Sequence, residues 1–138
     1  MLSGTAEYAL RAVLYIAQHG GVQRPVRRDE VAEALGVPRN YLSKILHALT
    51  QHGVLASTRG PQGGFRLARS AEGLAICRVI EVFDPVEPQR TCILGRPECS
   101  DDRPCPAHAR WKGISDQVSA FLRKTTIGDL LREAGSLV

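Results

Sequence analysis

Three cysteines within fourteen residues carry the clearest chemical signal in this sequence. Cys92, Cys99 and Cys105 lie in the segment TCILGRPECSDDRPCPAH, with six residues in the first gap and five in the second. Thiolates are soft ligands that suit iron–sulfur clusters and zinc. The gaps are wider than those of structural zinc knuckles, and a large cluster spans a wide loop more easily than one ion does. The spacing favours an iron–sulfur cluster, [4Fe-4S] or [2Fe-2S], with a zinc site or a thiol redox switch as alternatives.

Either kind of metal site normally takes four ligands, so a fourth donor is expected from outside the three cysteines. His108 follows Cys105 by three residues, at the expected start of the last helix. Glu7 lies early in the first expected helix and could reach a cluster across a dimer. The sequence leaves both donors open. Cys77 lies among apolar residues, and we interpret it as a core thiol.

Two short helices separated by a tight turn are predicted in the N-terminal half. The first covers residues 28–35 and carries acidic residues in its early turns, where the helix dipole favours them. Gly36 is suited to end it, and the second helix extends over residues 39–52. Two short strands follow over residues 54–58 and 65–68, joined by the glycine-rich turn RGPQGG. A hairpin directly after a helix-turn-helix predicts a winged helix.

The start of the second of these helices is expected to enter the major groove of duplex DNA. Cationic side chains there can neutralise phosphates or bind guanine edges, and an amide can pair with adenine. A wing arginine can enter the minor groove. Tyr41 could instead cover the hydrophobic core. The residues predicted to contact DNA are Arg28, Arg39, Asn40, Tyr41, Ser43, Lys44, Arg59, Gly60, Gln62 and Arg66, with Arg27 as a further backbone contact.

Charge is distributed unevenly along the chain. Residues 1–70 contain nine basic and four acidic residues, whereas residues 71–138 contain nine basic and ten acidic residues. The positive excess in the N-terminal half favours a polyanionic partner such as nucleic acid. No apolar run is long enough to span a membrane, and the first helix lacks the positive start of a secretory signal. We therefore expect a cytoplasmic protein with no membrane partner, in a compartment where a disulfide scaffold is disfavoured.

The remaining elements are expected to position the cysteines and the second helix of the helix-turn-helix, residues 39–52, which we call the reading helix. A first helix is predicted over residues 6–17 and a further helix over residues 71–83. The proline-rich cysteine loop, residues 84–108, leads into a long helix over residues 108–124. A short terminal turn is predicted over residues 127–134.

Apolar residues along the long last helix recur at steps of three and four, which is typical of a coiled-coil seam. The seam consists of Trp111, Ile114, Val118, Phe121 and Thr125. The predicted fold is mostly α. A winged helix-turn-helix domain with a two-stranded β wing covers residues 1–70. Residues 71–138 form a linker helix, the cysteine loop and a long C-terminal dimerisation helix.

The sequence resembles the IscR/NsrR-type family of bacterial winged-helix regulators over nearly its whole length. The resemblance rests on EYALRAVLYIA, on VPRNYLSKILHALTQHGVLASTRGPQGGFRLAR and on the three-cysteine loop. It implies a homodimer formed through the long last helix, a pseudo-palindromic DNA site and an iron–sulfur cluster near the dimer interface. By position, Cys92, Cys99 and Cys105 match the family's cluster cysteines. Arg59 matches the minor-groove arginine of the wing, and Ser43 matches a specificity position of the reading helix.

The two candidate fourth ligands match different branches of that family. The position of Glu7 matches a carboxylate that completes the cluster from the other subunit in the nitric-oxide-sensing branch. His108 matches the histidine ligand of the branch that regulates cluster assembly. The first cysteine gap has six residues, where five are common in the family. The resemblance therefore implies a cluster and leaves its type and fourth ligand open.

These features together predict a sequence-specific DNA-binding transcription regulator. We do not expect an enzyme, because the sequence contains no recognisable nucleophile–base pairing or phosphate-binding loop. An iron–sulfur cluster that senses nitric oxide, redox state or iron–sulfur status is predicted to control its affinity for double-stranded DNA. The alternative prediction is the same DNA-binding dimer with a zinc or thiol-redox sensor site.

Overall fold

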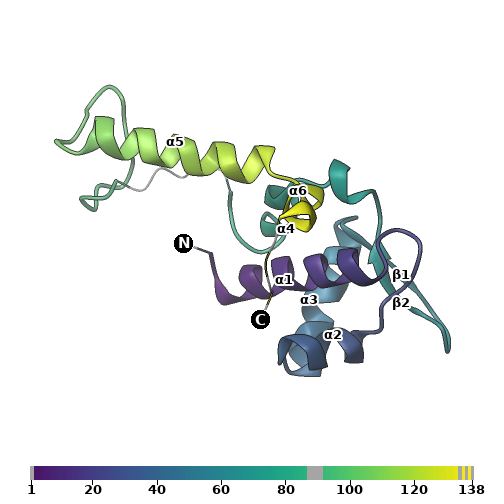
Figure 1. Cartoon of the computed structure of the whole chain (residues 1–138). Helices are drawn as coiled ribbons and strands as arrows, with labels where there is room; N and C mark the ends of the chain where they lie inside the picture. The colour runs from purple at the N-terminus through teal and green to yellow at the C-terminus, as the bar shows by residue number, and fades with distance from the viewer. Residues whose placement is uncertain (1, 87–91, 134, 136, 138) are drawn as a thin grey trace.

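The computed structural model describes residues 2–86, 92–133, 135 and 137. It is mostly helical with a single two-stranded sheet, as the sequence predicts, and a long helix projects from a winged-helix head (Figure 1). In chain order the elements are α1 (Gly4–His19), α2 (Arg28–Leu35), α3 (Arg39–Gln51), β1 (Leu55–Thr58), β2 (Gly64–Leu67), a 3-10 helix (Ala71–Gly73), α4 (Ile76–Ile80), α5 (His108–Lys124) and α6 (Ile127–Arg132).

Local sequence signals explain where the helices of the head begin and end. The Ser3 hydroxyl accepts a hydrogen bond from the Ala6 backbone N–H, so α1 starts two residues before the predicted position. Gly36 ends α2 in left-handed backbone with a φ of 65°, which glycine adopts without the steric cost of a Cβ. α2 and α3 begin at Arg28 and Arg39, as predicted. The helix-turn-helix prediction is therefore confirmed.

The wing is an antiparallel hairpin in which Leu55 of β1 pairs with Leu67 of β2. Val26 and Phe65 exchange two backbone hydrogen bonds of 2.8 Å, which join the hairpin to the segment before α2. Gly64 makes this junction possible, because its φ is +156° and a Cβ there would lie 2.4 Å from the Val26 carbonyl oxygen. The wing is thus attached to the rest of the molecule at two places: through the chain at the end of α3, and through hydrogen bonds to the segment before α2.

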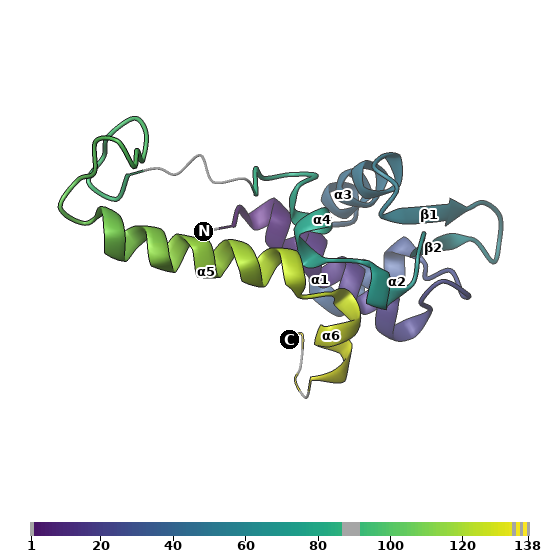
Figure 2. The same ribbon diagram turned by 90° about the horizontal axis from the view of Figure 1, so that it is seen from above.

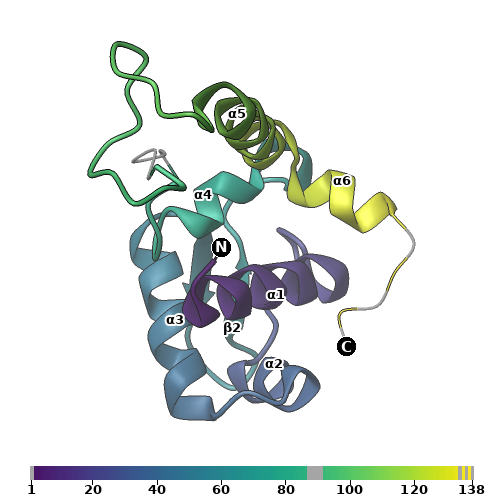
Figure 3. The same cartoon turned by 90° about the vertical axis from the view of Figure 1, so that its left-hand side faces the viewer.

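One hydrophobic core connects the head with the short helices that follow it. Leu42, Leu46 and Leu49 of α3 are fully buried. Ile76 of α4 and Ile127 of α6 belong to the same cluster. α1 runs through the middle of this arrangement, with α2 and α3 on one side and α4 and α6 on the other (Figure 3). α4 and α6 therefore share the hydrophobic core of the winged-helix head, although they come after its last strand, β2, in the sequence.

The helix predicted over residues 71–83 is wrong in its extent, because the structure divides it into the 3-10 helix and α4. Between these, Leu74 is extended, with a φ of −113° and a ψ of 98°. Its carbonyl accepts a 2.8 Å hydrogen bond from the Ile127 N–H, and the Ile76 N–H donates to the Thr125 carbonyl at 2.9 Å. These long-range hydrogen bonds use backbone groups that a continuous helix would need, which explains the break.

α5 projects beyond the head and carries the cysteine loop at the end that lies farther from the wing (Figures 1 and 2). Its bounds match the predicted long helix. Thr126 and Asp129 form a capping box, so the predicted terminal turn is a helix, α6, within the described residues. Ala134 lies outside the described residues. No helix in the described part of the chain is long and apolar enough to cross a membrane.

Candidate functional site

The first turns of α3 present polar side chains to solvent while the opposite face is buried. Arg39, Asn40 and Lys44 are exposed, and Leu42 between them is fully buried in the core. The core contact fixes the helix in the head, so its exposed residues are held on a rigid element. This arrangement suits a recognition helix, whose N-terminal residues approach phosphates and base edges.

A polar network joins the start of α2 to the start of α3. Arg28 Nη1 donates to the Ser43 hydroxyl at 3.0 Å, and that hydroxyl donates to the Arg39 carbonyl at 2.9 Å. Asp29 pairs with both arginines, at 3.2 Å from Arg28 Nε and 3.3 Å from Arg39 Nη1. The Arg28 hydrogen bond is the main cause of the lowered pKa of Asp29. Sequence reasoning missed Asp29, although its place beside Arg28 was an available signal.

Tyr41 combines features of a surface residue and of a packing residue. It is 36% exposed, yet its hydroxyl hydrogen-bonds with the hydroxyl of Thr5 in α1. Its ring meets that of Tyr8 edge to face, with centroids 5.8 Å apart, and the Arg11 guanidinium lies 5.6 Å from the Tyr8 centroid. Tyr41 therefore connects the reading helix to the first turns of α1 and retains an exposed surface.

The wing residues predicted to contact DNA divide between its turn and its returning strand. Arg59, Gly60 and Gln62 are exposed in the turn. Arg66 is half-buried on β2, opposite Ala56 of β1. The turn residues are thus accessible to a large ligand, whereas Arg66 is partly covered by the hairpin itself.

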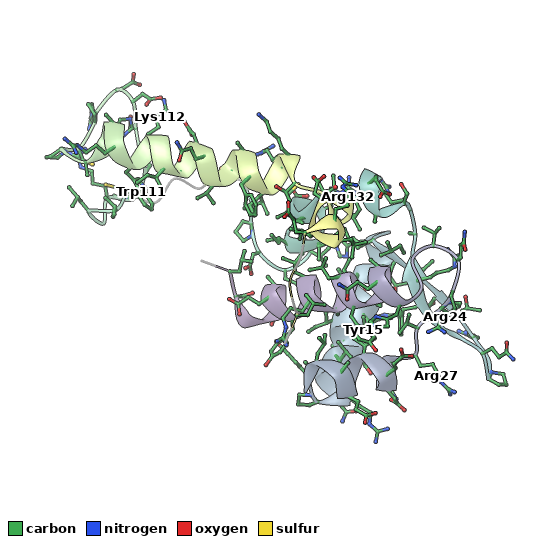
Figure 4. The ribbon with its side chains drawn as sticks, viewed as in Figure 1. Tyr15, Arg24, Arg27, Trp111, Lys112 and Arg132 are labelled. Carbon is green, nitrogen blue, oxygen red and sulfur yellow. The ribbon has the colours of Figure 1, made fainter. Side chains whose placement is uncertain are left out.

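A groove lies between the start of α2, the exposed side of α3 and the wing. Arg27, Ser43, His47 and Gly60 are among the residues that line it. Figure 4 places Arg27 at the wing side of the head, at the start of α2. Sequence reasoning missed His47, which follows Ser43 by four residues and so lies on the same face of α3. The groove brings residues from all three predicted DNA-contacting segments to one surface.

The described part of the cysteine loop arranges its donors in two pairs. The Sγ atoms of Cys92 and Cys105 are 3.6 Å apart, and Cys99 Sγ is 3.2 Å from His108 Nδ1. Cys77 and the three loop cysteines, all described, are free thiols. Three thiols and an imidazole are the donor types that suit an iron–sulfur cluster. Among the described residues, no three His, Cys, Asp or Glu side chains form a group that could hold a single metal ion.

Backbone hydrogen bonds favour the thiolate form of Cys92. The backbone N–H groups of Arg96 and Leu94 are the main causes of its lowered pKa, and the hydrogen bond with Cys105 acts in the same direction. Thiolates are both the metal-binding and the nucleophilic form of cysteine. This part of the loop is therefore suited to metal ligation and to thiol oxidation alike.

His108 is only 8% exposed at the first residue of α5. Its Nε2 is 2.7 Å from Asp101 Oδ1, and Lys112 Nζ donates to the same oxygen at 3.1 Å. The His108 hydrogen bond is the main cause of the lowered pKa of Asp101. Figure 4 shows Lys112 and Trp111 on the part of α5 that adjoins the loop. A carboxylate on one ring nitrogen orients a ligand histidine, and sequence reasoning missed this partner.

The candidate ligand Glu7 and the fourth cysteine, Cys77, lie outside the cysteine loop. Glu7 is exposed in the first turn of α1. Cys77 is buried beside Ala6 and Ile80, and this burial raises the pKa of its thiol. Its interpretation as a core thiol is confirmed. Of the two candidate fourth ligands, Glu7 and His108, it is His108 for which the structure gives a hydrogen bond with a loop cysteine, Cys99.

An apolar surface extends along α5. Ile114, Val118 and Phe121 are 55%, 42% and 55% exposed. Val118 and Phe121 also line an apolar groove to which Leu2 and Ile80 contribute. Exposed apolar residues gathered along one helix are typical of interaction surfaces.

Comparison with known proteins agrees with this architecture. Residues 2–133 match the Rrf2 family, described as "Iron-dependent Transcriptional regulator". An HTH-type transcriptional regulator of Aquifex aeolicus is 36% identical over 133 residues, which cover 95% of this chain and 91% of the relative. IscR of Vibrio campbellii is 33% identical over 132 residues, which cover 96% of this chain and 77% of the relative.

The fold has solved counterparts. The structure of CymR, described as the global cysteine regulator of B. subtilis, superposes with a TM-score of 0.78 at 24% identity, over 94% of this chain and 95% of that chain. The winged-helix prediction and the resemblance to IscR-type regulators are confirmed. This chain is a member of the Rrf2 family of winged helix-turn-helix transcriptional regulators.

Proposed function

We propose that this regulator is a homodimer that binds a pseudo-palindromic DNA site and adjusts its affinity through an iron–sulfur cluster held by the cysteine loop. The observation that carries the proposed cluster sensing is the collection of three thiols and one imidazole in one segment. Cys92, Cys99, Cys105 and His108 lie within two contacting pairs beside the start of α5. A bound cluster would supply a centre that reacts with nitric oxide or oxidants or loses iron.

DNA binding is supported by the groove between α2, α3 and the wing. Arg28 lines this groove, and Arg39 and Lys44 on α3 and Arg59 in the wing turn are exposed and can neutralise phosphates. Ser43 and Asn40 are short polar side chains on the same helix and can address base edges. The rigid attachment of the wing through Val26 lets the helix and the wing bind as one unit.

Dimerisation is supported by the apolar surface of α5. A twofold interface would bring the same exposed residues of two chains together. Ile114, Val118 and Phe121 of each chain would then be buried against the other chain. In such a dimer, the fourth cluster ligand is either His108 of the same chain or Glu7 of the other chain. The contact between His108 and Cys99 favours His108.

The first turn of α1 provides a route from the cysteine loop to the reading helix. The Ser3 N–H donates a 2.7 Å hydrogen bond to Asp84, at the start of the loop, and Thr5 two residues later bonds to Tyr41 of α3. A rearranged loop would displace Asp84 and with it the start of α1. The DNA affinity would then change by the difference in free energy between the two loop states.

Iron and acid-labile sulfide measurements on anaerobically purified protein test the sensing half. The single variants Cys92→Ala, Cys99→Ala and Cys105→Ala should each lose iron, sulfide and visible absorbance. Cys77→Ala is the matched control, because it removes a buried thiol outside the loop, and it should retain the cluster. Wild-type protein without iron or sulfide after reconstitution would exclude the cluster.

The DNA half is tested separately by selecting duplexes from a random library and measuring binding at increasing salt. Specific binding should persist at salt concentrations where binding to random duplex is lost. Arg59→Ala and Ser43→Ala should reduce the preference for the selected sequence. Equal affinity for selected and random duplexes at every salt concentration would contradict the proposal.

A thiol switch is the second candidate, because the Sγ atoms of Cys92 and Cys105 lie only 3.6 Å apart. A disulfide needs about 2.05 Å, so a small movement would close the bond. With a peroxide as oxidant, the two thiols would give one disulfide, and the peroxide would become two waters. Mass spectrometry after peroxide treatment should then find a Cys92–Cys105 crosslink, and a change in DNA affinity in metal-free protein would favour this candidate.

A further inference from the structure

One acidic residue, Asp29, lies among the arginines at the starts of α2 and α3. Asp29 is one of three acidic residues in α2, and it is the one that pairs with two predicted DNA-contacting arginines. Its carboxylate lies beside the groove that the wing and α3 also line. Duplex DNA would place phosphate oxygens at this surface, so the Asp29 carboxylate would compete with them for the same N–H donors.

Resting on the DNA-binding function proposed above, we propose that Asp29 is a specificity-determining residue that lowers the affinity for non-cognate DNA by holding Arg28 and Arg39. One carboxylate oxygen accepts from Arg28 Nε and the other accepts from Arg39 Nη1. The Ser43 hydroxyl holds a further nitrogen of Arg28. Both guanidinium groups are therefore pre-oriented by protein contacts.

The pre-orientation of the two arginines affects the affinity for cognate DNA less than the affinity for non-cognate DNA. On a random sequence, each arginine reaches a nearby phosphate only if it breaks its ion pair with Asp29 or divides its hydrogen bonds between Asp29 and the phosphate. On a cognate sequence, an arginine that meets a guanine edge gains two directed hydrogen bonds. The carboxylate thus reduces the general phosphate attraction, which carries no sequence information, more than it reduces base recognition.

The surroundings of Asp29 support an electrostatic role. Its side chain is 58% exposed, so the carboxylate is not required to fill the core. It occupies the second position of α2, where a negative charge also favours the helix start. An exposed ion pair typically changes an equilibrium by up to about fivefold. Two such pairs can together change DNA affinity by up to about twentyfold.

The test is Asp29→Asn, with Glu33→Gln as the matched control. Both substitutions remove one negative charge from an exposed residue of α2 with little change in shape, and Glu33 lies about one turn farther along the helix. Fluorescence anisotropy would measure binding to a random-sequence duplex and to a duplex selected with the wild-type protein, at several salt concentrations. Circular dichroism would confirm that each variant is folded.

Asp29→Asn should bind the random duplex about threefold to twentyfold more tightly than the wild type. The logarithmic salt dependence should steepen by about one unit, as expected for one further neutralised phosphate. The ratio of selected to random affinity should fall, and Glu33→Gln should change each quantity less. Equal effects of the two variants, or weaker DNA binding by Asp29→Asn, would overturn this inference. Wild-type protein that binds neither duplex would instead refute the DNA-binding function itself.

Discussion

Replacing Phe121 with alanine should weaken the proposed dimer by a predictable amount. A phenylalanine side chain buries about 150–250 Å² when it is covered, and Phe121 is 55% exposed in the single chain, which leaves about 110 Å² for a partner. At about 25 cal/mol per Å², this surface contributes about 2.7 kcal/mol per chain. Alanine keeps a methyl group and a partner covers only part of the ring, so about half of this value is expected.

A twofold interface contains Phe121 twice, so the effect is counted for both chains. About 1.4 kcal/mol per chain corresponds to a rise of about a hundredfold in the dimer dissociation constant. Sedimentation velocity over a range of protein concentrations measures this constant directly. The variant should also bind a two-half-site duplex less tightly than the wild type at protein concentrations where it is monomeric.

The matched control is Asp116→Ala, which changes an exposed residue five positions earlier, well around the helix from Phe121. It should leave the dissociation constant within about twofold of the wild type. A dissociation constant for Phe121→Ala that equals that of the control would refute the assignment of this surface to dimerisation. A wild-type chain that remains monomeric at all concentrations would do the same.

Three further predictions concern the fold of the head. Leu49→Ala removes a fully buried core side chain and should lower the free energy of unfolding by about 2–5 kcal/mol in urea titrations; a loss below about 1 kcal/mol would contradict the assigned core. The Thr126 backbone N–H is the main cause of the lowered pKa of Asp129. The stabilising contribution of Asp129 is therefore complete above its unfolded pKa of about 3.9 and is lost as the pH falls through the lower folded value. Asp129→Asn should flatten the acid side of the stability profile, and a variant profile parallel to the wild type would argue against this capping box. Gly64→Ala forces a Cβ against the Val26 carbonyl and should destabilise the protein by at least about 1 kcal/mol while weakening DNA binding; an unchanged melting temperature would show that the wing junction tolerates a side chain.

The sequence by itself determined the elements whose signals are local. The helix spacing of apolar residues and the stop at Gly36 predicted α2 and the start of α3 correctly. The RGPQGG turn predicted the wing, and the apolar residues at steps of three and four agreed with the long helix α5. These features follow from backbone preferences and periodicity within a few residues, so neighbouring residues suffice to predict them.

Cysteine spacing predicted a shared site for Cys92, Cys99 and Cys105, but it could not predict which side chains contact one another. That Cys92 lies against Cys105 while Cys99 lies against His108 depends on the path of the loop around the start of α5. Asp101 was missed as the partner of His108, because its role depends on a loop conformation that no short pattern encodes.

The tertiary structure alone decided the features that join distant parts of the chain. The break at Leu74 exists because Ile127, more than fifty residues later, takes its carbonyl as a hydrogen-bond acceptor. The contact between Ser3 and Asp84 joins residues 81 positions apart, and Asp29 meets Arg39 across two helices. Such contacts form only when packing of the apolar faces has brought the helices together, so their polar partners are set by the assembled core and not by sequence neighbours.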